Sequence, residues 1–137
     1  MAFADPATGR VILDSGRGTV PGTVVLAEAC KVGDVLGYSS GWKRALATVS
    51  SVIQGRLVAL RGGATGESVP VSANPVVGGY TGATPGNPVY VAEGTDNGKI
   101  TETIPATTND ATTVVGIALT ATEVMFFLNS RADSLSA

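Results

Sequence analysis

Histidine is absent from this sequence, and cysteine occurs once, as Cys30, in 137 residues. Most zinc sites and most activated-nucleophile sites are built from these two residue types, so their scarcity argues against both. A lone cysteine cannot form an internal disulfide bond, which is typical of a protein that folds in a reducing cytoplasm. We therefore expect no metal, no cofactor and no catalytic residue in this chain.

Charged and aromatic side chains are also few. Charged residues make up 15% of the chain and aromatic residues 5%, and the net charge is −2. Proteins that bind nucleic acid need clustered Lys and Arg to neutralise phosphates, or aromatic rings on which bases stack. The nearest approach to such a cluster is the pair Lys43-Arg44. We expect no nucleic-acid partner, and a surface this poor in charge is one that neighbouring subunits can cover.

Long apolar runs are missing as well. No run approaches the roughly 20 apolar residues that a membrane-spanning helix needs. The first residues, MAFADPATGR, lack the basic start and apolar core of a signal peptide. We expect no membrane partner and synthesis in the cytoplasm.

Short apolar runs between turn residues are abundant. Hydrophobic residues make up 44% of the chain, with 18 Gly and 7 Pro. Strand-like runs include TVVLAEAC, GRLVALRGG, TVVGIALT and EVMFFLNS. Short strands at this spacing are typical of barrels and sandwiches. We predict an all-β fold, a small barrel or sandwich of short antiparallel strands, with at most one short helix over Lys43–Ile53.

Three local patterns give sharper expectations. Asp96-Asn97-Gly98 predicts a tight two-residue hairpin turn, because Asn-Gly tolerates positive φ. The segment KITETI, residues 99–104, predicts an alternating strand with both of its isoleucines on one face. Among the large apolar side chains, we expect Trp42, Phe126 and Phe127 in the core, whereas Tyr80 suits either the core or an interface.

The chain divides into three parts. Residues 1–22 form an extended N-terminal arm in which Val11-Ile12-Leu13 is the one apolar run and the one candidate strand. The alternative for this segment is an unstructured terminus. Residues 23–129 form the β-barrel domain, and residues 130–137 form a polar C-terminal tail.

The two halves of the barrel domain echo one another at an offset of 53–59 residues. The matched segments are Gly33–Leu36 with Gly86–Val89, Lys43 with Lys99, Arg56–Leu60 with Val115–Leu119, and Gly66–Val69 with Ala121–Val124. This pattern predicts a duplicated, hairpin-rich unit. The alternative is that any small barrel repeats strands and turns.

Several motifs that suggest chemistry have simpler interpretations. Gly37–Gly41 matches G-x-S-x-G around Ser39, but that nucleophile needs a strand-to-helix turn and a histidine, so a hairpin turn is favoured. Leu60–Ser68 resembles a phosphate-binding loop with Glu67 where lysine belongs. Glu93, Asp96 and Asn97 lack the number of ligands of a calcium loop. Cys30 is interpreted as a small core residue.

A series of hairpin segments resembles a known family. Pro85–Val91, Gly98–Thr101 and Val114–Phe127 are similar to the closing half of the small capsid decoration proteins of tailed bacteriophages. The first half is matched by Gly33-Asp34-Val35, Trp42, Leu57–Leu60 and Gly66–Val71. The resemblance spans about residues 27–129 and leaves the arm outside.

The resemblance implies a virion structural protein that binds the outer surface of an assembled capsid and stabilises it against the pressure of packaged DNA. The implied partners are the major capsid protein and further copies of this chain, with a trimer as the expected oligomer. We expect the arm to add a strand to a capsid edge through Val11, Ile12 and Leu13, while Arg10 and Arg17 meet acidic groups.

Three alternatives remain at this point. The first is a β-barrel present in few copies in a phage head fibre or tail, where the same hairpin pattern occurs. The second is a small serine hydrolase built on Ser39, with Lys43 as its base. The third, a bacterial surface adhesin, is disfavoured by the N-terminal sequence.

Overall fold

The computed structural model describes residues 10–11, 22–128, 133 and 135. This part of the chain is all-β and contains no helix, which confirms the predicted fold class. The strands are β1 (Arg10–Val11), β2 (Gly22–Val25), β3 (Val35–Tyr38), β4 (Trp42–Arg44), β5 (Leu57–Ala59), β6 (Ser68–Ser72), β7 (Val76–Gly78), β8 (Pro88–Val91), β9 (Ile100–Thr101), β10 (Val114–Ala118) and β11 (Glu123–Phe126).

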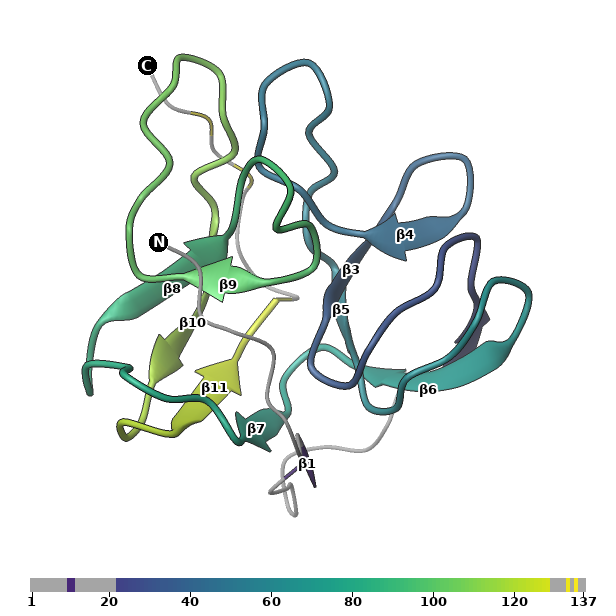
Figure 1. The fold of residues 1–137 in the computed structure, drawn as a ribbon, viewed down its shortest axis with the longest axis horizontal. Coiled ribbons are helices and arrows are strands. Elements are labelled where there is room, and N and C mark those ends of the chain that lie inside the picture. The colour runs from purple at the N-terminus through teal and green to yellow at the C-terminus, as the bar shows by residue number, and fades with distance from the viewer. Residues whose placement is uncertain (1–9, 12–21, 129–132, 134, 136–137) are drawn as a thin grey trace.

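The strands form two antiparallel sheets that lie side by side (Figure 1). One sheet has five strands in the order β2-β6-β5-β3-β4, and the other has six in the order β1-β7-β11-β10-β8-β9. Strands β2 and β4 are the two outer strands of the five-stranded sheet, yet an isolated bridge joins Leu26, just after β2, to Trp42 at the start of β4. The sheet therefore curls until its two edges meet. The fold is therefore a small sandwich in which one sheet approaches a barrel.

The two sheets repeat one topology. Strands β2–β6 and β7–β11 are each ordered first, fifth, fourth, second, third. Backbone hydrogen bonds repeat as well: the N–H of Gly33 donates to the Ala59 carbonyl at 2.9 Å, and the N–H of Gly86 donates to that of Ala118 at 2.8 Å. All four sequence pairings fall on or beside equivalent strands. The predicted duplication of a hairpin-rich unit is thus present in the topology.

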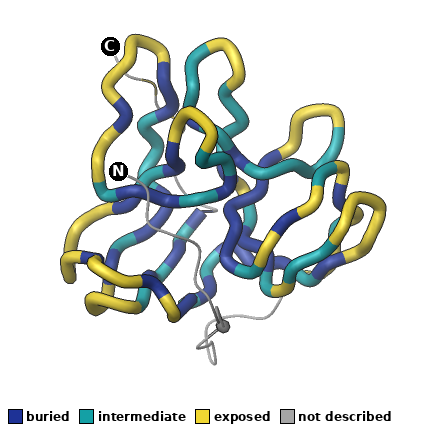
Figure 2. Tube along the Cα trace, viewed as in Figure 1, coloured by how far each residue is buried: buried dark blue, intermediate teal, exposed yellow. Residues whose placement is uncertain are grey.

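The core lies between the sheets and joins them. Its main cluster combines Val35 and Val58 from the first sheet with Val77, Val89 and Phe126 from the second. A smaller cluster fills the curled first sheet and includes Leu26, Leu36 and Cys30, as expected for that cysteine. Figure 2 shows buried positions concentrated in the strands and exposed ones in the hairpin loops. Because both sheets contribute to one cluster, the two repeats fold as one unit.

The segment considered for a helix, Lys43–Ile53, is not helical. It begins in β4 and continues as a loop in which the N–H of Ser51 donates to the Thr48 carbonyl at 3.0 Å. Its Ser, Thr and Val residues lose little by leaving the helical conformation, and edge pairing of β4 with β3 supplies hydrogen bonds instead.

Two local expectations in the second repeat were wrong in detail. Asn97-Gly98 does form a turn, which is closed by a 3.0 Å hydrogen bond from the N–H of Lys99 to the Asp96 carbonyl. Of its two central residues, only Gly98 has positive φ. The turn is the end of a longer loop between β8 and β9 and not a two-residue hairpin connection. Strand β9 ends at Thr101, whose hydroxyl accepts the N–H of Thr103 at 3.0 Å and turns the chain. Ile104 is consequently 51% exposed instead of sharing a buried face with Ile100.

The large aromatic side chains only partly follow the prediction. Phe126 and Tyr80 are buried in the main core. Trp42 is half-buried on the smaller cluster, and Tyr38 packs against it edge to face with a centroid distance of 5.4 Å. Phe127 is also half-buried, because neighbouring residues of a strand alternate between faces and Phe126 takes the inner one.

Candidate functional site

The predicted capsid-binding residues fall on the N-terminal arm, of which the structure describes two. Arg10 and Val11 form β1, which pairs antiparallel with β7 in the register Arg10 to Gly78 and Val11 to Val77. Among the described strands, β1 is the outermost one of its sheet. Ile12, Leu13 and Arg17 lie outside the described residues. Two residues of the arm, Arg10 and Val11, thus form a short strand, and the rest of the predicted run Val11-Ile12-Leu13 lies outside the described residues.

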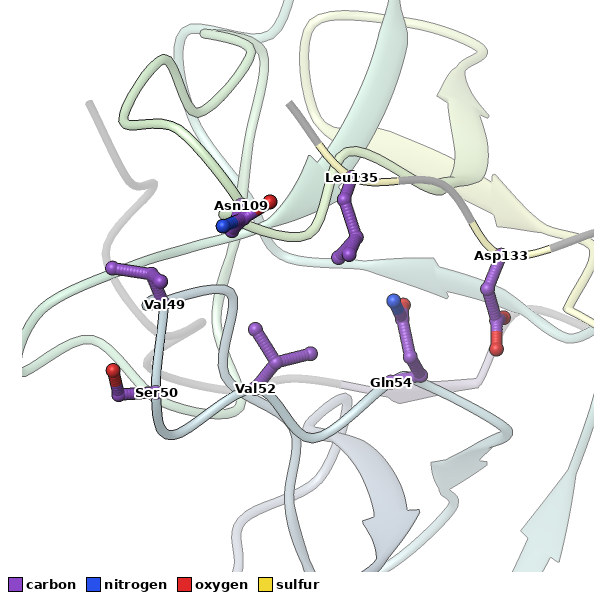
Figure 3. Close-up of a pocket in the computed structure, with 7 residues that line it drawn as sticks. All are labelled: Val49, Ser50, Val52, Gln54, Asn109, Asp133 and Leu135. Carbon is purple, nitrogen blue, oxygen red and sulfur yellow. The ribbon is translucent and has the colours of Figure 1, made fainter. Parts of the chain in front are cut away.

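A groove of about 810 Å³ opens on the described surface between two loops (Figure 3). One wall comes from the loop between β4 and β5, and the other from the loop between β9 and β10. The Leu135 side chain points into the groove toward Val52 and Gln54. The lining residues are Val49, Ser50, Val52, Gln54, Asn109, Asp133 and Leu135.

The two loops that flank the groove carry the same turn. The N–H of Ser51 bonds the carbonyl of Thr48 at 3.0 Å, and the N–H of Asp110 bonds that of Thr107 at 2.9 Å. The third residue of each turn is left-handed, with φ of 73° at Ser50 and 72° at Asn109. The groove is therefore framed by equivalent turns of the two repeats. Asn is a common residue at such positions and Ser is not, so this conformation at Ser50 depends on its surroundings.

Asp110, in the loop between β9 and β10, is hydrogen-bonded to the loop between β4 and β5. Its side chain is fully buried, and its Oδ1 atom accepts the N–H of Val49 at 2.7 Å. Nearby, the N–H of Gly94 donates to the Thr48 hydroxyl at 2.7 Å. Residues 48–49 of the first repeat are thus held from both sides by the second. The other carboxylate oxygen, Oδ2, is buried and has no well-aligned donor among the described residues.

Glu93, an exposed acid of the second repeat, lies next to Asp110. Hydrogen bonding with Asp110, followed by burial, raises the pKa of the Glu93 carboxyl above its usual range. The same interaction is the main reason why the pKa of Asp110 is lowered, and the N–H of Val49 lowers it further. The physical cause is that two adjacent carboxyl groups retain one proton between them. A shared proton favours Glu93 over Asp110, since backbone donors stabilise the charged form of Asp110.

Replacing Glu93 by Gln should stabilise the protein above neutral pH. Because the pKa of Glu93 is raised in the folded protein, its protonated form stabilises the fold. This stabilisation is complete below pH 4.5, the ordinary pKa of a glutamate, and is lost as the pH rises through the pKa that Glu93 has in the folded protein. Gln keeps a hydrogen-bond donor at every pH, so its advantage in melting temperature should grow from near zero at pH 4 to a few degrees at pH 8. Thermal melts across this range measure it.

Glu102→Gln is the matched control, because it removes the same charge from a carboxylate that accepts the Thr84 N–H at 2.6 Å and needs no proton for it. Equal pH dependence for Glu93→Gln and the parent chain would contradict the assignment.

The lowered pKa of Asp110 affects stability at acidic pH. The stabilisation from its charged carboxylate is present above pH 3.8 and is lost as the pH falls through the pKa that Asp110 has in the folded protein.

Two residues of the C-terminal tail close one side of the groove. The carboxylate of Asp133 forms paired bonds to the Arg56 guanidinium at 2.7 and 2.8 Å, and these bonds raise the pKa of Arg56. Leu135 forms an isolated antiparallel bridge with Ala111. These contacts join residues far apart in sequence, and no local pattern in the polar tail predicted them.

The motifs weighed for chemistry are parts of hairpins. Ser39 lies in the turn between β3 and β4, where its N–H donates to the Gly41 carbonyl at 2.9 Å, and a strand follows instead of a helix. In the loop before β6, Glu67 Oε1 accepts the N–H of Ala64 at 2.8 Å. Burial, followed by the charge of Asp34, raises the pKa of the Cys30 thiol.

Acidic side chains near the β8–β9 loop pair with other groups. Asp96 lies 3.7 Å from the Lys99 ammonium nitrogen. Within the described ranges, three or more His, Cys, Asp or Glu side chains nowhere gather as a metal site would require. The same part of the chain contains no helix long and apolar enough to cross a membrane.

Comparison with known proteins gave no relative. The chain matches no protein family, no curated protein and no solved structure.

Proposed function

We propose that this chain is a virion structural protein that binds the outer surface of an assembled phage capsid and stabilises it. The main support is the resemblance of residues 27–129 to capsid decoration proteins. The matched segments of both halves lie on or next to equivalent strands of the two sheets, so the resembling residues belong to one repeated framework. The low charge of the chain suits a protein covered by neighbours on the outside of a shell.

The arm is the proposed capsid-binding element. Strand β1 uses one edge to pair with β7, and as the outermost strand of the sheet it has a second edge. An unpaired strand edge is a template for pairing with another chain. In the proposal, the segment from Arg10 to Leu13 pairs with an edge strand of the major capsid protein, and Arg10 and Arg17 contact acidic groups beside it.

The proposed partners are the major capsid protein and further copies of this chain, with a trimer as the expected assembly. A trimer places several arms on the shell at once, so individually modest contacts combine into tight attachment. The proposed location is the outer face of the capsid, after synthesis in the host cytoplasm.

The test is binding of the purified chain to capsids that lack it. We expect saturable co-sedimentation with expanded shells and a higher temperature of DNA release once the sites are filled. No saturable binding to expanded shells would contradict the proposal. We also expect little binding to unexpanded shells; equal binding to both forms would refute this dependence on the mature lattice, while leaving attachment itself in place.

A further inference from the structure

Arg44 differs from the other arginines of residues 22–128 because its guanidinium has no close acceptor among the described residues. Arg56 donates to a carboxylate at 2.7 and 2.8 Å, and Arg61 donates to a carbonyl oxygen at 2.7 Å. The Arg44 guanidinium makes one long hydrogen bond of 3.4 Å, to Glu28. Its Nε atom is buried and has no acceptor in the described part of the chain. A buried charged donor without an acceptor costs free energy, and an anion that supplies one removes that cost.

The Arg44 side chain is held in place where the two repeats meet. Its aliphatic part lies against Gly98 of the second repeat, where an added methyl group would be 3.0 Å from the Arg44 Cγ and Cδ atoms. Glu28 accepts the Arg44 backbone N–H at 2.9 Å in addition to the long bond from the guanidinium. The side chain is nevertheless 32% exposed. Its donors are therefore preorganised and within reach of a ligand, which would lose little free energy in ordering them.

A small pocket of about 140 Å³ opens beside Arg44. The rest of its lining consists of Ala29, Cys30 and Lys31. This volume is below the roughly 300 Å³ at which pockets begin to hold drug-sized ligands, so the pocket suits one small group. Because two of the four lining residues are basic, that group is an anion.

Basic residues outnumber acidic ones around the pocket. Of the two acidic residues nearby, Glu28 is already bonded to Arg44, and Asp34 is buried and accepts the backbone N–H of Lys31 at 2.9 Å. The basic residues nearby are Lys31, Lys43, Arg44 and Arg61. The surroundings of the pocket are thus positive in a chain whose net charge is −2, and a positive pocket attracts anions.

We propose that this pocket binds a carboxylate, the end of an Asp or Glu side chain of a protein partner, through the Arg44 guanidinium and the Lys31 ammonium. The paired N–H donors of a guanidinium match the two oxygens of a carboxylate, and the Arg56–Asp133 pair of this chain has that geometry. A phosphate group carries nearly two negative charges, so Glu28 would repel it more strongly. The pocket lies in the first repeat, whereas β1 pairs with the second, so this site is additional to the proposed arm contact.

The Nε–H group of Arg44 can be followed by NMR in the full chain as a reporter of the pocket. Sodium acetate, exchanged for sodium chloride at constant ionic strength, should shift its signal in a saturable way. The Arg56 guanidinium, which already bonds a carboxylate, is the internal control, and its signal should stay in place. An Arg44 signal that does not respond, or that responds only as Arg56 does, would overturn the proposal.

Two lysine substitutions test the second charge of the pocket. Lys31→Gln and Lys99→Gln each remove one ammonium group, but only Lys31 lines the pocket. We expect Lys31→Gln to weaken acetate binding several-fold and Lys99→Gln to leave it unchanged. Equal effects of the two substitutions would show that only the overall charge of the chain matters, and would overturn the proposal.

Two blocked peptides and inorganic phosphate test the source of the carboxylate. The peptide acetyl-Gly-Glu-Gly-amide should shift the Arg44 signal as acetate does, and acetyl-Gly-Gln-Gly-amide should not. Inorganic phosphate should bind more weakly than acetate. Acetate binding without a response to the Glu peptide would overturn the assignment to a protein side chain, and tighter binding of phosphate would overturn the choice of a carboxylate. No capsid is present in these experiments, so failure here leaves capsid binding through the arm untouched.

Discussion

Gly116→Ala should lower the free energy of unfolding by about 3 kcal/mol, the upper end of the usual cost of overfilling a core. Gly116 lies in β10, opposite Phe126 of β11 and at the irregularity where β10 meets β8. A methyl group there would overlap the carbonyl oxygen of Met125 and lie 3.1 Å from the Phe126 Cα atom. Because both obstacles are backbone, relief requires moving β11 away from β10. Urea denaturation followed by fluorescence measures the loss.

Gly94→Ala separates this steric effect from the general cost of replacing a glycine. At Gly94 an added methyl group meets nothing within 4 Å, but φ is +75°, so the expected cost is about 1 kcal/mol of backbone strain. If Gly116→Ala were no more destabilising than Gly94→Ala, the close packing of β10 on β11 would be wrong.

Removing residues 1–21 should reduce capsid binding by about a hundredfold or more while the two-sheet body stays folded. The deletion removes β1 and keeps residues 22–128, which contain every residue of both core clusters. A paired strand with its side-chain contacts is worth several kcal/mol, and each 1.4 kcal/mol is tenfold in affinity. Co-sedimentation with expanded capsids measures binding, and circular dichroism verifies the fold. Undiminished binding of the folded, shortened chain would refute the role of the arm.

A pair of single substitutions in the full chain tests whether the arm binds as a strand. Val11→Pro removes a backbone N–H and is poorly tolerated in a paired strand, whereas Val11→Thr keeps a β-branched residue. We expect the proline variant to approach the deletion in its loss of capsid binding and the threonine variant to bind almost as the parent chain does. Equal binding by both would mean that the arm acts through something other than strand pairing.

The repeated sheet order was predictable because it depends on local signals. The segments Gly33–Leu36 and Gly86–Val89 each start with a turn glycine that precedes an apolar strand, and Gly33 and Gly86 both adopt positive φ, at 87° and 88°. A turn and the strand after it are specified by neighbouring residues. Matching such units along the chain was therefore enough to anticipate equivalent strands.

The expectations that failed concern residues whose position is decided by distant contacts. Ile104 leaves the alternation of β9 because the Thr101 hydroxyl accepts a hydrogen bond from the Thr103 N–H. Any Thr-x-Thr segment can form this bond, and the surrounding fold decides whether it does. Trp42 remains half-buried because it lies at the end of the curled sheet, where β4 meets the chain after β2 only through the bridge to Leu26. Periodicity predicts the face to which a side chain points, and the position of the strand in the sheet decides how deeply that face is buried.

The groove could not be predicted from the sequence, because it too depends on contacts between distant residues. Arg56 and Asp133 are 77 residues apart, and Val49 and Asp110 are 61 apart. Each partner on its own reads as an ordinary surface or turn residue. Only the packing of one repeat against the other brings the equivalent turns around Ser50 and Asn109 to the two sides of one hollow.

The most direct test of the proposed function is the number of copies of this chain in purified phage particles, measured by quantitative mass spectrometry against the major capsid protein. Decoration of a capsid lattice predicts hundreds of copies in a fixed ratio to that protein. A handful of copies would contradict it and favour a component of a head fibre or tail. Complete absence from particles would contradict any role in the virion.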